Sequence, residues 1–547
     1  MDIHTVKKME KKALKSTQGD FMRLGLAFAF MALVLWYAFG INAGAENQAF
    51  LAIAALFGAY MALNIGANDV ANNVGPAVGS KALTMGGAIL IAAVFEAGGA
   101  IIAGGDVVST IKKGIIDPSQ FVDVSQFIWA MTGALLAGGL WLNIATKVGA
   151  PVSTTHSIVG GVMGGGIAAA GFSIVSWGTM GKIAASWIIS PVLGGVIAAL
   201  FLYTIKKTIL YKEDRLAAMN KMVPIYVSIM AFAFATYLTL KGLKKIWPSI
   251  VETFNAVSPI AMEVAKKPTL MNGLTIGLVA SIITFIVVKP MIKKASAKLN
   301  NTAKDANSLF TIPLIFAAAL LSFAHGANDV ANAIGPLAAV ADAVQNAGIS
   351  SKASIPLWVM LIGAIGISLG LALYGPKLIK TVGSEITELN QIRAYSIAMA
   401  ASITVIIASQ LGLPVSSTHI AIGGIFGVGF LREYLSDTTE QERIEAEEQQ
   451  LQEDKQQKKT LKSEYKELKA KAVKSDEERK RIDVLKTLIA EEEAKIEYEK
   501  KHLKRAKKAK YVKRSAIMKI VAAWVITVPA AAILSATFYF IISGIMS

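Results

Sequence analysis

The sequence predicts an all-α membrane protein that crosses the bilayer many times and is built from two copies of one unit. Of its 547 residues, 54% are hydrophobic and 17% are charged, whereas a soluble domain has roughly a quarter charged residues. Apolar runs of about 20 residues, the length of a transmembrane helix, recur along the chain. Two polar motifs also occur twice, in the same order, within this apolar sequence.

Residues 1–47 consist of a basic arm and the first expected transmembrane helix. Because cytoplasmic loops are enriched in Lys and Arg, the arm is expected inside and the apolar residues 21–39 lead outward. The formal net charge of +17 is attributed to such loops, not to nucleic-acid binding. The chain has no cysteine, which excludes disulfides, thiolate metal sites and cysteine nucleophiles. It also lacks the Walker motif that would indicate ATP hydrolysis.

Residues 48–205 form the first copy of the repeated unit, and residues 308–436 form most of the second. GANDVANNVGP at residues 66–76 returns as GANDVANAIGP at residues 326–336. PVSTTHS, which begins at Pro151, returns as PVSSTHI, which begins at Pro414. Because the order is the same, each half is interpreted as one structural unit used twice. Residues 206–307, between the copies, contain basic loops and two further apolar segments.

A charged insert, residues 437–514, separates the second copy from its last helix, residues 515–547. The offset between the copies grows from 263 at the two prolines (414 − 151) to 337 at Trp187 and Trp524 (524 − 187). The insert is rich in Glu, Lys and Gln, and its centre carries a capping box, Ser475 with Glu478. We therefore predict two charged helices folded back as an antiparallel hairpin. Its role, either a solvated spacer or a docking or regulatory element, stays open.

The distribution of basic residues predicts that the two copies cross the membrane in opposite senses. The first copy begins outside and ends inside, at the basic residues 206–221, and the second begins inside, after residues 289–304. Such an inverted repeat is the architecture of many secondary transporters. A duplication in the same sense is the alternative, and it requires that only one of the two intervening segments spans. The N-terminus and the insert are expected in the cytoplasm.

The repeated Asp motif places a carboxylate at membrane depth, where a charge costs roughly 3 kcal/mol on insertion scales. Such residues usually bind ions or protons, and a carboxylate hydrogen-bonded to backbone is the structural alternative. Pro76 and Pro336 are expected to end their helices and so to free backbone carbonyls. A cage of carbonyl, amide and carboxylate oxygens suits Na⁺. The predicted cation-binding residues are Asn68, Asp69, Asn72, Asn328, Asp329 and Asn332.

The repeated hydroxyl motif predicts an anion site. A proline pre-sets the start of a helix, and the N–H groups and positive dipole end of that helix attract anions. Ordinary N-capping is the alternative for one such motif, but its duplication beside the Asp motif favours a binding site. The predicted anion-binding residues are Ser153, Thr154, Thr155, Ser416, Ser417 and Thr418.

Three further polar residues lie in apolar sequence. Glu96 has no clear partner in LIGAIGISLG, the matching stretch of the second copy, and is interpreted as a coupling residue or a structural one. His156 and His419 occupy equivalent positions but lack metal-ligand spacing. They are expected to orient neighbouring hydroxyls or to pack in place.

These paired motifs, GANDVAN…GP with PVSTTH and PVSSTH, resemble the inorganic phosphate transporter (PiT) family across both copies. The resemblance implies symport of phosphate with Na⁺ or H⁺, with phosphate and cations held by the Asn/Asp motifs and by Ser/Thr re-entrant hairpins. Thr110 and Thr381, in matching strings, are further contributors under this resemblance. The chain departs from many members by its short middle loop and late insert, so the role of the insert cannot be carried over.

The first functional hypothesis is therefore a transporter that imports inorganic phosphate together with a cation, with Na⁺ favoured. No enzymatic activity is expected. An H⁺-coupled phosphate or sulfate permease is the alternative within transport, since both oxyanions are tetrahedral. An ion channel and a receptor that signals through the insert are alternatives of other classes. No cofactor beyond the coupling ion is expected. The expected location is the cell membrane, and a homodimer is one oligomeric state considered.

Overall fold

The computed structural model describes residues 3–41, 44, 47–148, 152–244, 246–257, 265–346, 348, 355–384, 389–471, 475–508 and 514–546. Within these ranges, side chains are described except at residues 3–18, 148, 381–384, 436–446, 501–502, 504–508, 514–520 and 523–524. Pro151, expected to open the first hydroxyl helix, lies outside the described residues, as does the side chain of Thr381.

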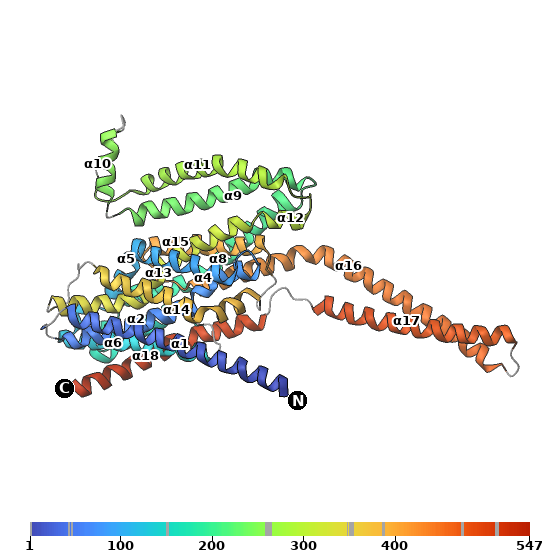
Figure 1. Ribbon diagram of the computed structural model, residues 1–547, viewed down its shortest axis with the longest axis horizontal. Coiled ribbons are helices and arrows are strands. Elements are labelled where there is room, and N and C mark those ends of the chain that lie inside the picture. The colour runs from blue at the N-terminus through green and yellow to red at the C-terminus, as the bar shows by residue number, and fades with distance from the viewer. Residues whose placement is uncertain are drawn as a thin grey trace. The chain divides into compact units, whose positions relative to one another are not determined.

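The described chain is helical throughout the regions that the sequence predicts to be helical (Figure 1). The first half contains α1 (Ile3–Ile41), α2 (Gln48–Asn68), α3 (Val70–Gly79), α4 (Met85–Ala103), α5 (Gly105–Lys113), α6 (Val124–Val148), α7 (Thr154–Ala170) and α8 (Trp177–Ile205). Then follow α9 (Arg215–Tyr237), α10 (Trp247–Val257), α11 (Leu270–Ser296) and α12 (Ala303–Ser308). The second half contains α13 (Thr311–Gln345), α14 (Leu357–Ser384), α15 (Gln391–Gln410), α16 (Ser417–Ala470), α17 (Asp476–Lys508) and α18 (Arg514–Met546).

Among the described residues, eleven helical segments are long and apolar enough to cross a membrane. They include both apolar segments between the copies, Arg215–Gly242 and Leu270–Ser296. The prediction of an all-α protein that crosses the membrane many times is thus confirmed. The helices divide into two compact units, one of Met1–Val428 with Arg514–Ser547 and one of Gly429–Lys513.

Within the first unit, each copy packs its Asp-bearing helix against a helix of the other copy. A Cβ added to Gly66 of α2 would lie 1.9 Å from the carbonyl oxygen of Ile367 in α14. A Cβ added to Gly326 of α13 would lie 2.2 Å from the carbonyl oxygen of Glu96 in α4. Only glycine permits helix backbones to approach so closely. The two contacts are equivalent in the two copies, and they bring the middle of α2 and the middle of α13 into one core.

The hydroxyl motifs lie at the turns of two helical hairpins. Ile116, before α6, forms a β-bridge with Val175, after α7, so α6 and α7 start and finish at the same end of the bundle. The second hairpin is α15 with the first turns of α16. Helix α18 packs against α6 and α7, and α8 packs against α15. Both hairpins therefore point their turns into the core occupied by α2 and α13.

The expectation that Gly75-Pro76 and Gly335-Pro336 end their helices is wrong. Helix α3 continues through Pro76 to Gly79, and α13 continues through Pro336 to Gln345. A helix survives an internal proline when surrounding packing supports it, although the proline gives no N–H to the carbonyl four residues earlier. In the first copy α2 is separated from α3 by Asp69 alone, whose backbone stays right-handed helical (φ −84°, ψ −37°) and whose N–H donates to the carbonyl of Ile65 (2.9 Å). The second copy has no break at Asp329, which lies inside α13.

The second unit is a pair of charged helices, α16 beyond residue 428 and α17, lying side by side (Figure 1). Ser475 and Glu478 form the reciprocal bonds of a capping box, from Ser475 N to Glu478 Oε2 (2.9 Å) and from Glu478 N to Ser475 Oγ (3.2 Å). Leu451, Ile496 and Leu503 make a small apolar cluster between the helices. The pair is otherwise joined by ion pairs such as Arg481 with Glu464.

Candidate functional site

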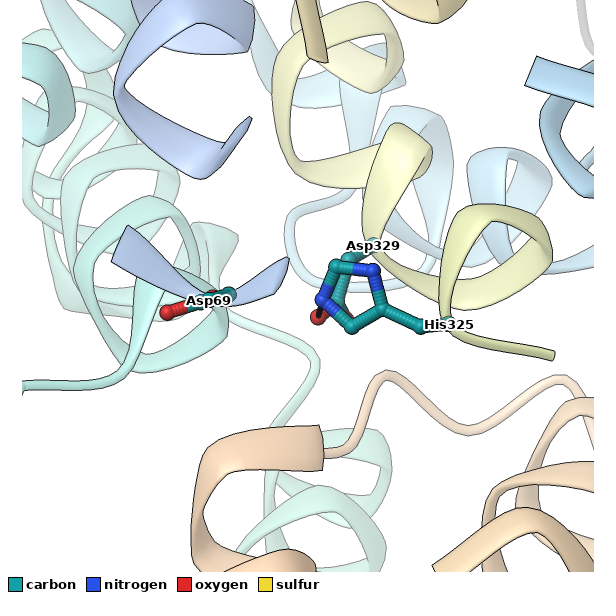
Figure 2. A group of neighbouring side chains, drawn as sticks. All are labelled: Asp69, His325 and Asp329. Carbon is teal, nitrogen blue, oxygen red and sulfur yellow. Dashed lines mark ion pairs between the residues drawn. The ribbon is translucent and has the colours of Figure 1, made fainter. Parts of the chain in front are cut away.

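The two motif carboxylates meet in the core of the first unit. Asp69 lies at the junction of α2 and α3, and Asp329 lies one turn beyond His325 on α13 (Figure 2). Asp69 is 2% exposed and Asp329 is fully buried. One ligand atom from each of Asp69, His325 and Asp329 lies within 4.8 Å of the other two. Residues 260 positions apart (329 − 69) thus form one cluster.

Each carboxylate accepts hydrogen bonds from hydroxyls in the first turn of a hairpin helix. Thr154 Oγ1 donates to Asp69 Oδ2 (2.5 Å), and Thr418 Oγ1 donates to Asp69 Oδ1 (3.2 Å). Ser417 Oγ donates to Asp329 Oδ2 (2.9 Å). Asp69 therefore joins a hydroxyl from its own half to one from the other half, and the site belongs to both copies.

The second asparagine of each motif completes this network. Asn72 Nδ2 donates to Thr418 Oγ1 (2.8 Å). Asn332 Nδ2 donates to Thr154 Oγ1 (3.2 Å) and Thr155 Oγ1 (3.1 Å). Both asparagines therefore reach the hairpin of the opposite copy. All of these groups are buried, so their hydrogen bonds lie in a low-dielectric region where they are strong.

The first asparagine of each motif has a different task. Asn68 Nδ2 donates to the carbonyl of Val152 (3.4 Å). Asn328 Nδ2 donates to Ser409 Oγ (2.9 Å) and to the carbonyl of Leu413 (3.2 Å), and its Oδ1 accepts from Val415 N (3.3 Å). Asn68 and Asn328 therefore position the loops that precede the hydroxyl helices rather than the carboxylates.

The two hydroxyl helices begin at equivalent places and approach each other. Ser153 is the N-cap of α7 and accepts from His156 N (3.2 Å). Ser416 accepts from His419 N (3.3 Å) in the same way. The alternative of N-capping is thus realised by the first serine of each motif, and the next two hydroxyls lie inside the helix. Thr155 Oγ1 donates to the carbonyl of Val415 (2.9 Å), which ties the two helix N-termini together.

Glu96 contacts a histidine and an asparagine. Its Oε2 lies 2.7 Å from His325 Nδ1, and its Oε1 accepts from Asn73 Nδ2 (2.8 Å). The other ring nitrogen, His325 Nε2, lies 2.7 Å from Asp329 Oδ2. His325 therefore connects Glu96 to the motif carboxylate. His325 is not among the site residues predicted from the sequence. The sequence does distinguish it, because a histidine precedes the second GAND string where Ile65 precedes the first.

The remaining predicted residues lie at the edge of this cluster or apart from it. Thr110 Oγ1 donates to the carbonyl of Gly412 (2.7 Å), next to the second hairpin turn. The rings of His156 and His419 meet edge to face, with centroids 4.7 Å apart. Their equivalence in sequence therefore becomes a contact between the copies. Thr381 lies on α14, and its side chain is outside the described residues.

The proline positions leave two main-chain carbonyls without a helical N–H donor. Because Pro76 and Pro336 lack an N–H, the carbonyls four residues earlier, those of Asn72 and Asn332, receive no helical hydrogen bond from them. The ligand atoms of Asp69 and Asp329 lie within 4.8 Å of each other. Two ionised carboxylates at that limit would repel each other by roughly 3 kcal/mol at an effective dielectric constant near 20, and a cation or proton between them would relieve this. Carboxylate, hydroxyl and carbonyl oxygens are hard ligands that suit such a cation.

This fold and site define a membrane transport protein: buried carboxylates and two helix N-termini meet at the centre of a bundle of membrane-spanning helices. A family model described as the phosphate transporter family matches residues 65–535. The chain belongs to the phosphate transporter family. It is a multi-pass membrane protein and a transporter rather than an enzyme.

Individual relatives agree with this assignment. A Helicobacter pylori (strain J99) protein named "Putative phosphate permease" is 48% identical over 548 residues, covering 98% of each chain. A relative of the same description from Pyrococcus furiosus is 40% identical over 382 residues, covering 70% of this chain and 87% of the other. A solved structure titled "The sodium-dependent phosphate transporter" aligns with a TM-score of 0.69 at 30% identity, over 90% of this chain and 99% of that one.

Proposed function

We propose that this protein imports inorganic phosphate together with Na⁺, and that the cluster around Asp69 and Asp329 binds both. The observation that carries the proposal is that each carboxylate accepts hydrogen bonds from hydroxyls at a hairpin helix N-terminus. Groups that attract a cation and groups that attract an anion therefore share one buried place. A cation and phosphate bound there would neutralise each other, which favours their joint passage.

The Na⁺ would lie among the carboxylates and the carbonyls of Asn72 and Asn332. The sodium-dependent transporter that this chain resembles in fold supports this choice. The phosphate would face the first-turn hydroxyls and N–H groups of α7 and α16, where helix dipoles favour an anion. A carboxylate beside that anion can accept a proton from phosphate but not from fully ionised sulfate. We therefore propose phosphate over sulfate as the substrate.

Uptake of radiolabelled phosphate into proteoliposomes tests the proposal, with Na⁺ replaced by choline at several pH values. We expect uptake to require Na⁺, to follow an imposed Na⁺ gradient, and to persist when an equal concentration of sulfate is added. Uptake in choline that follows a pH gradient would assign H⁺ coupling instead. Displacement by equimolar sulfate would make the protein a sulfate permease, and an ohmic single-channel current would make it a channel.

A further inference from the structure

A groove of about 470 Å³ runs between α8 and α15 and is lined mostly by apolar side chains. Its walls include Ile189 and Leu193 of α8 and Ile407 of α15, and its floor is formed by the segment of Leu413 and Val415 that leads into the second hairpin helix. This is the segment that Asn328 holds through hydrogen bonds to Leu413 and Val415. The groove therefore touches the back of the proposed transport site.

The equivalent place in the other copy is filled by a tryptophan. The offset of 263 between the hairpin turns of the two copies pairs Trp141 with Thr404 (404 − 141). The offset of 337 between the helices that cover the hairpins pairs Ser190 with Thr527 (527 − 190). Trp141 Nε1 donates to Thr527 Oγ1 (3.2 Å). In the second place Thr404 and Ser190 both line the groove.

At Ser190, no side chain of the described chain makes the hydrogen bond that Trp141 makes to Thr527. The hydroxyl of Ser190 is buried, with the residue 6% exposed, and it has no hydrogen-bond partner among the residues that the structure describes. A threonine in the position of a tryptophan is thus one difference between the copies at this groove.

The groove opens on an exposed apolar surface of a chain that spans the membrane. Ile189, Ile407 and Leu411, which line it, are 61%, 44% and 69% exposed. Along α8 it extends from Lys182 to Leu193, a span of about 16 Å at 1.5 Å per residue. One leaflet of the hydrocarbon core is about 15 Å thick. The exposed Lys182 therefore lies about one leaflet's thickness from the far end of the groove.

We propose that the groove between α8 and α15 binds a phospholipid, with an acyl chain along the apolar wall and an anionic headgroup at Lys182. An acyl chain would bury the exposed isoleucine and leucine side chains, which accounts for the apolar length of the groove. The ammonium of Lys182 would pair with a phosphodiester, which accounts for the charged end. Because the chain would contact Leu413 and Val415, the bound lipid would stabilise the position of the second hairpin turn.

Photo-crosslinking tests this proposal without relying on phosphate transport. The full-length protein is placed in nanodiscs that contain phosphatidylglycerol with a diazirine in one acyl chain, and labelled peptides are mapped by mass spectrometry. We expect label on α8 and α15 in the wild type. Thr404→Trp, which installs the side chain of the equivalent position, should abolish that label. Thr404→Ser, the matched control, keeps the groove open and should retain it.

Two further variants keep the test decisive. Trp141→Thr should open the equivalent place and bring new label to α6 and α18, which no general loss of folding would produce. Lys182→Gln should remove the preference for phosphatidylglycerol over phosphatidylcholine. Equal labelling of the wild type and Thr404→Trp would overturn the proposal. Absence of label from α8 and α15 in the wild type would also overturn it.

Discussion

The imidazole of His325 on α13 lies 2.7 Å from the carboxylate of Glu96 on α4, and both side chains are fully buried. The equivalent positions of the other copy hold isoleucines. Ile65 precedes the first GAND string as His325 precedes the second, and Ile367 opposes Gly66 as Glu96 opposes Gly326. One copy therefore has a charged contact where the other has an apolar one, so the two motif aspartates have unequal surroundings.

A double-mutant cycle on this pair should show strong coupling. Removing one partner of a buried pair leaves an uncompensated polar or charged group and typically costs about 3–5 kcal/mol, whereas replacing both with apolar residues is often neutral. Glu96→Ile and His325→Ile should each lower the thermal unfolding midpoint in detergent. The double variant, which copies the isoleucine pair of the other half, should recover much of that loss. Additive losses would show that the contact carries no stabilisation.

Substitution of either motif aspartate should abolish coupled uptake. Asp69→Asn and Asp329→Asn each remove one negative charge from a cluster whose ligand atoms lie within 4.8 Å of each other, and with it the main attraction for a cation. Both variants should still be recovered as folded protein in the membrane, because Asn retains the shape of the side chain. Phosphate uptake in proteoliposomes provides the measurement.

The matched control for this pair is Asp20→Asn, since Asp20 is an exposed carboxylate that pairs with Arg23 on α1. It should transport like the wild type. Wild-type uptake by Asp69→Asn or Asp329→Asn would remove these carboxylates from the mechanism.

The hydroxyls of the hairpin helices should separate into two classes. Thr154→Val and Thr418→Val remove donors at the helix N-termini, and a lost hydrogen bond to a charged group costs about 1.5–3 kcal/mol, so the KM for phosphate should rise on the order of tenfold or more. Thr154→Ser and Thr418→Ser retain the hydroxyl and should transport normally. An unchanged KM in both valine variants would place phosphate elsewhere.

The capping serines should instead affect stability. Ser153 and Ser416 each accept a backbone N–H three residues on, and loss of such a cap typically costs about 1 kcal/mol. Ser153→Ala should therefore lower the unfolding midpoint while the KM for phosphate changes less than in Thr154→Val. A KM increase as large as that of Thr154→Val would show that Ser153 binds the substrate directly.

The charged hairpin should loosen in acid. Hydrogen bonds from Lys462 and Lys458 lower the pKa of Glu493 to about 2, below its usual range near 4.3. A lowered carboxyl pKa in the folded state contributes stability above the unfolded pKa, and this is lost as the pH falls from about 4.3 towards 2. Spin labels at Lys459→Cys and Ala490→Cys, in the full-length protein, should report a broader distance distribution over that range. Glu493→Gln should show a broader distribution already at neutral pH, and an unchanged distribution at pH 2 would contradict the prediction.

The sequence predicted the members of the site better than their contacts. The repeated polar strings identified Asp69, Asp329 and the first-turn hydroxyls because polar residues are costly in apolar sequence and their repetition is visible by inspection. It could not assign Glu96 to His325, since that contact depends on how closely α4 packs on α13 at Gly326. The prediction that Pro336 ends its helix was wrong, because the sequence shows the missing N–H but not the packing that keeps α13 continuous around the proline.

The internal equivalence of the copies predicts the membrane sides of their connections. Lys81, between α3 and α4, and Gln345, at the end of α13 before α14, occupy equivalent places in the two copies. If the copies are inverted, Lys81 faces the cytoplasm and Gln345 faces the outside.

Because the chain has no cysteine, Lys81→Cys and Gln345→Cys each give a single site for an impermeant maleimide on intact cells. Gln345→Cys and the outer control Ser119→Cys should react from outside. Lys81→Cys and the inner control Glu213→Cys should react only after the cells are opened. Reaction of Lys81→Cys and Gln345→Cys from the same side would establish a duplication in the same sense, and the two carboxylates would then reach the core from helices that cross the membrane in the same direction.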